Sequence, residues 1–251
     1  MIAHTSVAAG GRAAFMLHAD HPLHAHYDGF WQAARPALEV GAVEIDLHLS
    51  GAQPDGRRGL ALILRPPAAV ATALAAFLAE AAQIEPGQYL YPITDLHITV
   101  LSLFTATVQY QPHYARLTTY RAATDAALRD APPIQIAFRG ITAVRGAVMI
   151  QGFPADEGLN QLRDRLRQEL HAVGMGDTLD QRYRIRAAHL TAIRFTSPLR
   201  DAAGFCALLD RARDRDFGTA TITAADLVAN DWYLSSTHTR LLHRYALGCA
   251  P

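Results

Sequence analysis

The sequence contains no lysine, so all 23 of its strongly basic side chains are arginines. A P-loop requires a lysine that reaches the nucleotide phosphates, and Schiff-base or lysyl-adenylate chemistry requires a lysine nucleophile. The absence of lysine therefore excludes P-loop nucleotide hydrolysis, Schiff-base enzymes and ATP-dependent ligation through a lysyl adenylate.

Cysteine is scarce, and the chain holds only Cys206 and Cys249. Two thiols are too few for a disulfide framework or a cysteine-rich zinc site, and we interpret both as inert. The N-terminus lacks a basic start followed by an apolar stretch, and no later run of residues has the length and apolarity of a membrane span. These features predict a cytoplasmic protein with no membrane partner.

Net charge is also lacking, because 23 acidic residues balance the 23 arginines. Without an overall positive field, a protein does not hold a long nucleic acid by neutralising its phosphates, so a small or short substrate is expected. Half of the 251 residues are apolar and 18% are charged, which is typical of a packed globular protein. The length allows one large domain or two lobes.

Alternation and helical spacing of apolar residues predict regular structure from residue 42 onwards. Residues 1–42 have no clear periodicity, and we expect an extended arm or a short surface helix that adds little to the core. The predicted strands are 43–47, 59–64, 95–104, 134–138, 146–150 and 188–195, followed by a hairpin of 228–234 and 240–247; the predicted helices are 74–84, 113–130 and 159–173.

One order of elements occurs twice in the chain. A buried strand that starts with glycine, a proline, a helix and a strand with the pattern H-x-T run from Gly59 to His97, and again from Gly146 to His189. Two copies are too few for a solenoid. The duplication predicts an α+β fold over residues 43–248, in which two pseudo-symmetric lobes, with two antiparallel sheets and flanking helices, face a central cleft.

The two H-x-T patterns combine residue types that suit phosphodiester cleavage. Side chains at positions i and i+2 of a strand point to the same face, so His97 projects with Thr99, and His189 projects with Thr191. Because the unperturbed pKa of histidine is about 6.5, one imidazole can act as base while the other acts as acid. The threonine hydroxyls can hold the non-bridging phosphoryl oxygens.

The tetrapeptides His97-Ile-Thr-Val and His189-Leu-Thr-Ala resemble the paired motifs that define the 2H phosphoesterase superfamily, and the resemblance covers residues 42 to 248. It implies a bilobal α+β fold, no metal, no organic cofactor, and catalytic or phosphate-binding roles for the two histidines and the two threonines. Members of the superfamily include 2′,3′-cyclic nucleotide phosphodiesterases, 2′-5′ RNA ligase-like proteins and enzymes that cut 2′-5′ oligonucleotides. The expected function is hydrolysis of a cyclic or 2′-5′ phosphodiester in a nucleotide or short RNA.

Several residues near the motifs are further candidates for substrate contact. An arginine fork can hold a phosphate, and an aromatic ring can stack on a base. We assign Arg194 to the Leu190 face of its strand, where a solvated or ion-paired role is at least as suitable. The candidates for substrate contact are Tyr91, Tyr183, Arg184 and Arg186, with Tyr89 and Trp232 as other possible stacking residues.

Two other functions remain open. The same cleft could bind a nucleotide or an RNA end without turnover, although two complete acid–base motifs favour catalysis. Alternatively, the histidine cluster before residue 27 could hold a metal ion, or this segment could cover the cleft as a lid, but few carboxylates accompany the histidines. No protein partner is implied, and we expect a monomer. The cluster consists of His18, His21, His24 and His26, with Asp20 among them.

Overall fold

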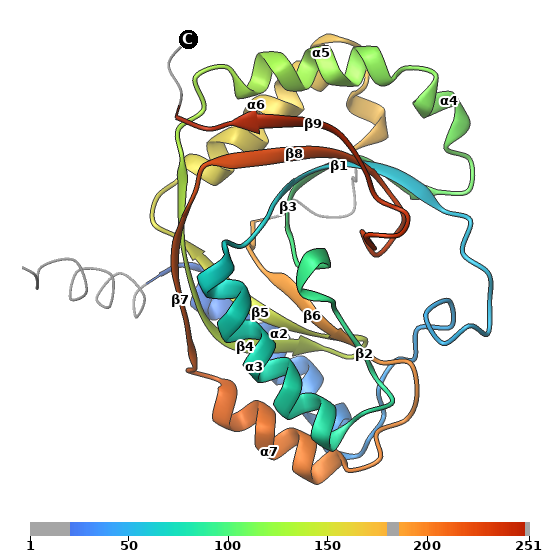
Figure 1. Ribbon diagram of the computed structural model, residues 1–251, viewed down its shortest axis with the longest axis vertical. Coiled ribbons are helices and arrows are strands. Elements are labelled where there is room, and N and C mark those ends of the chain that lie inside the picture. Colours follow the sequence, from blue (N-terminus) through green and yellow to red (C-terminus); the bar gives the residue numbers. More distant parts are fainter. Residues whose placement is uncertain (1–20, 180–185, 249–251) are drawn as a thin grey trace, which may run out of the picture.

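The computed structural model describes residues 21–179 and 186–248, and within these ranges the chain folds into two antiparallel sheets with flanking helices (Figure 1). The first sheet has the strand order β3-β1-β8-β9, and the second has the order β2-β6-β5-β4-β7. The strands are β1 (Arg58–Leu64), β2 (Tyr89–Leu90), β3 (Ile98–Thr107), β4 (Ile134–Val144), β5 (Ala147–Pro154), β6 (Leu190–Arg194), β7 (Asp216–Ile222), β8 (Ala224–Asn230) and β9 (Arg240–Ala246).

The helices are exchanged between the two lobes. Helix α3 follows β1 of the first sheet but packs against β7 of the second, whereas α6 follows β5 of the second sheet and packs against β3 of the first (Figure 1). Each copy of the duplicated unit therefore contributes to both lobes. The α-helices are α2 (Leu23–Glu39), α3 (Ala68–Ile84), α4 (Gln111–Tyr114), α5 (Leu117–Leu128), α6 (Gly158–Ala172) and α7 (Ala202–Ala212), and short 3₁₀ turns cover Ile93–Asp95 and Gly176–Thr178.

The duplicated, bilobal α+β arrangement predicted from the sequence is confirmed. Strand β1 pairs with β3, and β5 pairs with β6, so the glycine-led strand lies beside the H-x-T strand in both copies. Strand β8 occupies the other side of β1, as β4 occupies the other side of β5. Both glycine-led strands are almost entirely buried, as their continuous apolar sequences indicate.

Several predicted elements differ in the structure. Residues 43–47 form no strand, although their backbone makes isolated hydrogen bonds to Arg145 and Phe195. The helix predicted over 113–130 is interrupted after Tyr114, which gives α4 and α5. Both motif histidines also lie outside their strands, because His97 immediately precedes β3 and His189 immediately precedes β6. The first strand of the predicted C-terminal hairpin, 228–234, is shifted to β8, which ends at Asn230. Val43 and Ile45 are half-buried whereas Leu47 is exposed, so the apolar alternation in 43–47 does not mark a strand of a sheet.

The N-terminal segment contributes more to the core than its sequence indicates. Helix α2 packs along β4, and both Tyr27 and Leu38 are fully buried. The expectation of an arm that adds little to the core is therefore wrong for residues 23–39. A buried tyrosine lowers stability unless its hydroxyl has a hydrogen-bond partner, and the partners of Tyr27 lie far away in the sequence.

Across residues 21–179 and 186–248, no helix combines the length and apolarity needed to cross a membrane.

The hydroxyl of Tyr27 holds the backbone next to the second motif. It donates to the carbonyl of Gly152 over 3.0 Å and accepts from the amide of Ala188 over 3.1 Å. A Cβ at position 152 would lie 2.0 Å from the Ala188 carbonyl oxygen, so glycine permits this close approach. The N-terminal helix thereby fixes the residue that precedes His189.

Replacing Tyr27 with phenylalanine tests this anchor. The variant leaves the buried amide of Ala188 without its partner, and an unsatisfied buried group costs about 1–3 kcal/mol. Urea unfolding should show that loss of stability relative to the wild type. Tyr245→Phe is a matched control, since its hydroxyl bonds the exposed Asp125, and it should change stability by less than about 1 kcal/mol. Equal losses in both variants would contradict the anchoring role.

Candidate active site

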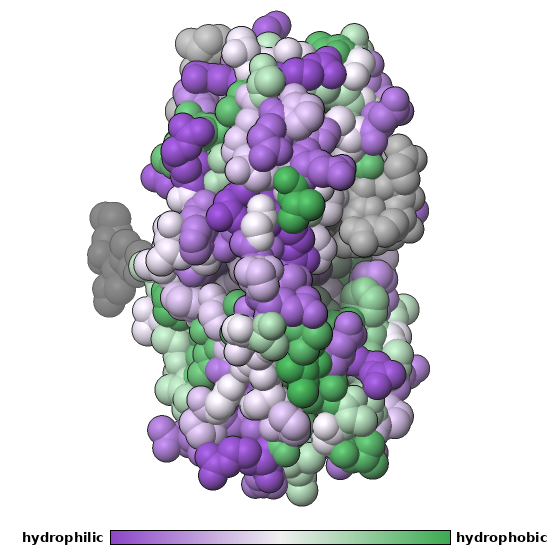
Figure 2. Space-filling model, turned by 90° about the vertical axis from the view of Figure 1, so that its right-hand side faces the viewer, coloured by the Kyte–Doolittle hydropathy of each residue, from purple (hydrophilic) through white to green (hydrophobic). Residues whose placement is uncertain are grey.

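A cavity of about 200 Å³ lies between the two sheets and receives both H-x-T motifs. Its walls come from β3, from β6 and from the segment after β8. In the surface view, polar side chains gather across the middle of the molecule between the two lobes (Figure 2). The lining residues used below are Tyr91, His97, Thr99, Ser102, Arg167, His189, Thr191, Arg194 and Trp232.

The motif side chains alternate with buried neighbours, as the strand pattern requires. His97 and Thr99 are half-buried and line the cavity, whereas the residues on either side of them, Leu96, Ile98 and Val100, are fully buried or nearly so. The second motif repeats this arrangement, with His189 and Thr191 in the cavity wall. The structure therefore brings all four motif residues predicted from the sequence to one cavity.

Each motif is followed by an irregularity in strand pairing. Thr99 pairs with Ile63 and Leu101 with Leu62, so Val100 is an extra residue in β3. In β6, Ala192 is the equivalent extra residue. A bulge of this kind reverses the faces to which later side chains point. Its consequence in β6 is that Arg194 faces the cavity with His189.

The assignment of Arg194 to the opposite face of its strand is therefore wrong. Its Nε donates to the hydroxyl of Tyr91 over 3.2 Å, and its Nη1 lies 3.9 Å from a carboxylate oxygen of Asp46. The guanidinium also lies over the ring of Tyr233, 5.4 Å from the centroid. These contacts hold a cation in the cavity wall beside the second motif, where it can attract a phosphate.

The two histidines differ in the hydrogen bonding of their ring nitrogen Nδ1. In His97, Nδ1 donates to the carbonyl of Asp95 over 2.7 Å, which leaves Nε2 as the acceptor of the neutral ring. In His189, Nδ1 is buried and has no hydrogen-bond partner among the residues that the structure describes. His97 therefore has a fixed tautomer that suits a general base.

Burial is the main influence on both imidazoles. It lowers the pKa of His97 to about 4, against a smaller opposing effect of the hydrogen bond to Asp95. Burial also lowers the pKa of His189 to about 4, and the charges of His97, Arg163 and Arg194 act in the same direction. Both rings are therefore neutral at pH 7. An anionic phosphate placed between them would raise these pKa values and favour protonation of one ring.

Protein stability should depend on these depressed pKa values. The unfolded chain, with histidine pKa values near 6.5, binds more protons than the folded chain between about pH 6.5 and pH 4, so stability falls as the pH falls through this window. The expected loss from pH 7 to pH 5 is roughly 2 kcal/mol for each imidazole. Urea unfolding at several pH values should give a shallower slope for the double variant His97→Asn/His189→Asn, and an unchanged slope would contradict the depressed pKa values.

A buried arginine from α6 connects the two motifs from behind. Arg163 is fully buried, and its Nε donates to the carbonyl of Val100 over 3.0 Å, while its Nη2 donates to Thr99 over 3.1 Å and to Ala187 over 2.8 Å. Its Nη1 donates to the carbonyl of Arg186 over 3.0 Å. Burial, together with Arg167, lowers the pKa of Arg163 to about 10, so the guanidinium stays charged at pH 7. The sequence analysis missed this residue, whose helical position predicts only an ordinary surface arginine.

The remaining candidates have different positions. Tyr91 lines the cavity, but its side chain is almost fully buried and its hydroxyl accepts a hydrogen bond from Arg194. Trp232 also lines the cavity. Arg186 is exposed and lines a separate pocket beside His21. Tyr89 packs edge-on against Tyr91. The candidates Tyr183 and Arg184 lie outside the described residues, as do His18, Asp20 and Cys249.

The described histidines of the N-terminal cluster make contacts with the protein. His21 bonds the carbonyl of Pro154 over 3.0 Å, His24 packs on Phe153, and His26 packs edge-on against Phe30. Among the residues described, no three His, Cys, Asp or Glu side chains are arranged to hold a metal ion. No residue of α2 lines the cavity, and the earlier part of the segment considered as a lid lies outside the described residues.

Several solved structures have a fold similar to that of this chain. The protein TT0787 of Thermus thermophilus is 18% identical, with a TM-score of 0.57 over 76% of this chain and 98% of that chain. A crystal structure described as a phosphoesterase is 18% identical, with a TM-score of 0.50 over 77% of this chain and 99% of the other. A conserved protein of unknown function from Agrobacterium tumefaciens is 13% identical, with a TM-score of 0.55 over 82% and 96% of the two chains.

These structural similarities show a shared fold. The comparison with curated protein sequences gave no significant match. A family model, described as the 2′-5′ RNA ligase superfamily, matches residues 66–231, which is more than half of the chain and includes both H-x-T motifs. Membership in this group, which the paired motifs also indicate, supports an activity of the phosphodiesterase or ligase type. The chain belongs to the 2′-5′ RNA ligase superfamily of 2H phosphoesterases.

Proposed function

We propose that this chain is a metal-independent phosphodiesterase that hydrolyses a 2′,3′-cyclic or 2′-5′ phosphodiester of a nucleotide or short RNA. The observation that carries the proposal is the convergence of His97, Thr99, His189 and Thr191 on one cavity. Binding alone would not require two acid–base groups at the same place. Family membership supports phosphodiester chemistry of this general type.

The proposed reaction uses one histidine on each side of the phosphorus atom. A neutral imidazole removes a proton from water as the water oxygen forms a bond to phosphorus. The bond from phosphorus to the leaving ribose oxygen breaks, and the second imidazole, protonated in the complex, gives its proton to that oxygen. The fixed tautomer of His97 suits it to the base role for hydrolysis, and the two roles exchange in the reverse direction.

Groups in the cavity wall can stabilise the negative charge on the phosphoryl oxygens. Thr99 and Thr191 supply hydroxyl donors, and Arg194 supplies a cation that Tyr91 holds in place. The buried charge of Arg163 lies behind both motifs. Preorganised donors and charges of this kind stabilise a transition state without rearrangement during the reaction.

The test is turnover of 2′,3′-cyclic nucleotides and 2′-5′-linked dinucleotides in the presence of excess EDTA. We expect hydrolysis of at least one of these substrates, at a rate that the chelator does not change. Loss of activity on chelation, restored by added metal, would contradict the metal-independent mechanism. Saturable binding of these nucleotides without any turnover would favour a non-catalytic nucleotide-binding module.

A further inference from the structure

A second cavity opens beside the one described above and has a volume of about 540 Å³. We call it the second chamber. It shares His189, Thr191, Arg194 and Trp232 with the catalytic cavity. The two spaces therefore meet at the second motif, where the scissile phosphate is expected to lie.

The second chamber has walls from two parts of the chain. One wall is the segment 44–57, between α2 and β1, and the other is the turn between β4 and β5. The segment 44–57 lies before residue 66, where the family match begins. It is therefore a feature of this chain outside the matched region of the superfamily.

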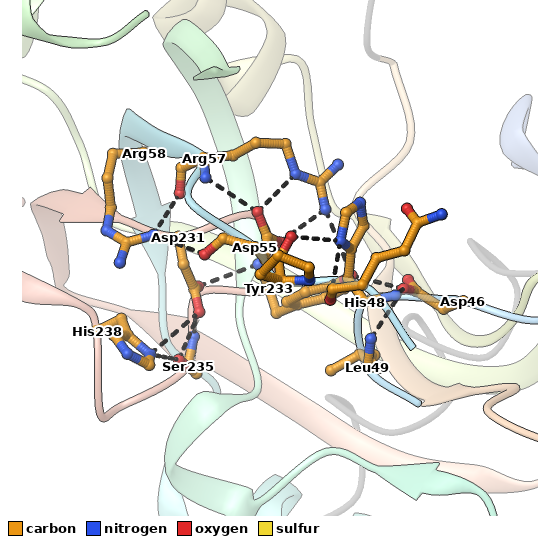
Figure 3. A network of polar contacts seen from close by, with 12 residues as sticks. Asp46, His48, Leu49, Asp55, Arg57, Arg58, Asp231, Tyr233, Ser235 and His238 are labelled. Atoms are coloured by element: carbon orange, nitrogen blue, oxygen red, sulfur yellow. Dashed lines mark hydrogen bonds and ion pairs between the residues drawn. The ribbon is translucent and has the colours of Figure 1, made fainter. Parts of the chain in front are cut away.

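Polar contacts hold the segment 44–57 against the loop after β8 (Figure 3). The hydroxyl of Tyr233 donates to Asp46 over 2.6 Å, and the same carboxylate oxygen accepts from the amides of His48 and Leu49 over 3.1 Å each. In the loop after β8, Asp231 accepts from the Tyr233 amide over 3.1 Å. These hydrogen bonds fix the side chains of this wall in defined positions.

A second pair of contacts fixes the aromatic residue at the junction. Arg57 makes two hydrogen bonds to the carboxylate of Asp55, over 2.7 and 2.8 Å. The guanidinium carbon of Arg57 lies 4.4 Å from the centroid of the Trp232 ring, which holds one face of the indole. Trp232 is half-buried and borders both cavities, as His189, Thr191 and Arg194 do.

The chemistry of the second chamber suits a nucleoside. Leu47 is 47% exposed and lies in the wall with Ile45 and Val144, which gives an apolar surface for a planar base. Arg145 is exposed at the chamber and has no ion pair among the residues that the structure describes. It can approach the phosphate or sugar of a longer substrate.

We propose that the second chamber binds the nucleoside on one side of the scissile phosphate while the catalytic cavity binds the nucleoside on the other side. The preferred substrate is then at least a dinucleotide, whereas a cyclic mononucleotide is a poorer substrate that fills only one of the two spaces. This inference rests on the proposed function, because it places the phosphodiester at the junction beside His189.

Leu47→Asp tests the inference by placing a negative charge on the apolar wall. We expect the KM for a 2′-5′-linked diadenosine substrate to rise at least tenfold more than the KM for 2′,3′-cyclic AMP. Leu241→Asp is the matched control, since Leu241 on β9 is 50% exposed and lines neither cavity, and it should change neither value. Equal effects of Leu47→Asp on both substrates, or no effect on either, would overturn the second chamber as a subsite.

A binding measurement separates this inference from the proposed reaction. The chain has two tryptophans, so Trp31→Phe leaves Trp232 as the only indole reporter. Titration of its fluorescence should show the dinucleotide binding at least tenfold more tightly than 3′-AMP, and Leu47→Asp should remove that difference. Equal affinities in the reporter protein would refute the chamber whether or not turnover occurs. A clear affinity difference without turnover would support the chamber and refute the proposed reaction.

Discussion

Replacing either His97 or His189 with asparagine is expected to lower kcat by about 10²–10⁴-fold, the range in which a general acid or base contributes. Asparagine keeps a polar side chain of similar reach but cannot exchange a proton near neutral pH. Because the cavity receives both imidazoles, loss of one leaves either the attacking water or the leaving oxygen without its proton partner. The measurement is kcat on the preferred substrate at saturating concentration.

His113→Asn is a control for this pair, since His113 lies against Phe104 and Tyr120 in the first lobe and is not a cavity residue. Its kcat should stay within about twofold of wild type. Circular dichroism and urea unfolding at pH 7 establish that the two motif variants are folded. A folded His189→Asn protein with wild-type kcat would remove this residue from the mechanism.

Replacing Arg163 with methionine is expected to lower both stability and turnover. The change removes four hydrogen bonds from a charged donor to backbone carbonyls, at a combined cost on the order of 3–5 kcal/mol. Those carbonyls belong to Thr99 and Val100 of one motif and to the two residues that precede Ala188. Because displacement of a reacting group by about 1 Å can cost 10²-fold, we expect kcat to fall by about that factor.

The control variant Arg213→Met distinguishes a loss of stability from an effect of Arg163 on the positions of the motif residues. Arg213 also links distant elements, since it donates to the carbonyl of Ile141 and to Asp28, but it does not line the cavity that receives both motifs. It should lose stability with kcat unchanged, whereas Arg163→Met should lose both, with a larger effect on kcat than on KM. Arg163→Lys, with fewer donors, should recover only part of the lost kcat. If Arg163→Met folds and keeps wild-type kcat, the arginine has only a structural role.

The repeated order of elements was the part of the fold that could be predicted from sequence. Buried strands such as β1 and β5 are continuous apolar runs, and α6 shows a regular stripe of leucines, so each copy was recognisable. The four motif residues followed from the two-residue period of a strand. That part of the site depends only on local geometry.

The remaining features depend on contacts that are distant in sequence. The side chain of Arg194 faces the cavity because β6 gains an extra residue at Ala192, and such a bulge has no signal in a single sequence. Arg163 and Tyr27 are important because their side chains form hydrogen bonds with backbone carbonyls and amides of other elements. The segment 43–47 alternates like a strand but has no strand to pair with, which only the packed structure shows.

The central claim is that His97 and His189 form an acid–base pair around a phosphate, and histidine proton NMR tests it most directly. Spectra of the wild type, His97→Asn and His189→Asn assign the two ring signals, which are then titrated from about pH 3 to about pH 8 to include both sides of the expected transitions. In the free protein both pKa values should lie near 4. With 3′-AMP bound, the account predicts that the pKa of one imidazole rises by about one unit or more. Two imidazoles whose pKa values do not respond to the bound phosphate would contradict the account.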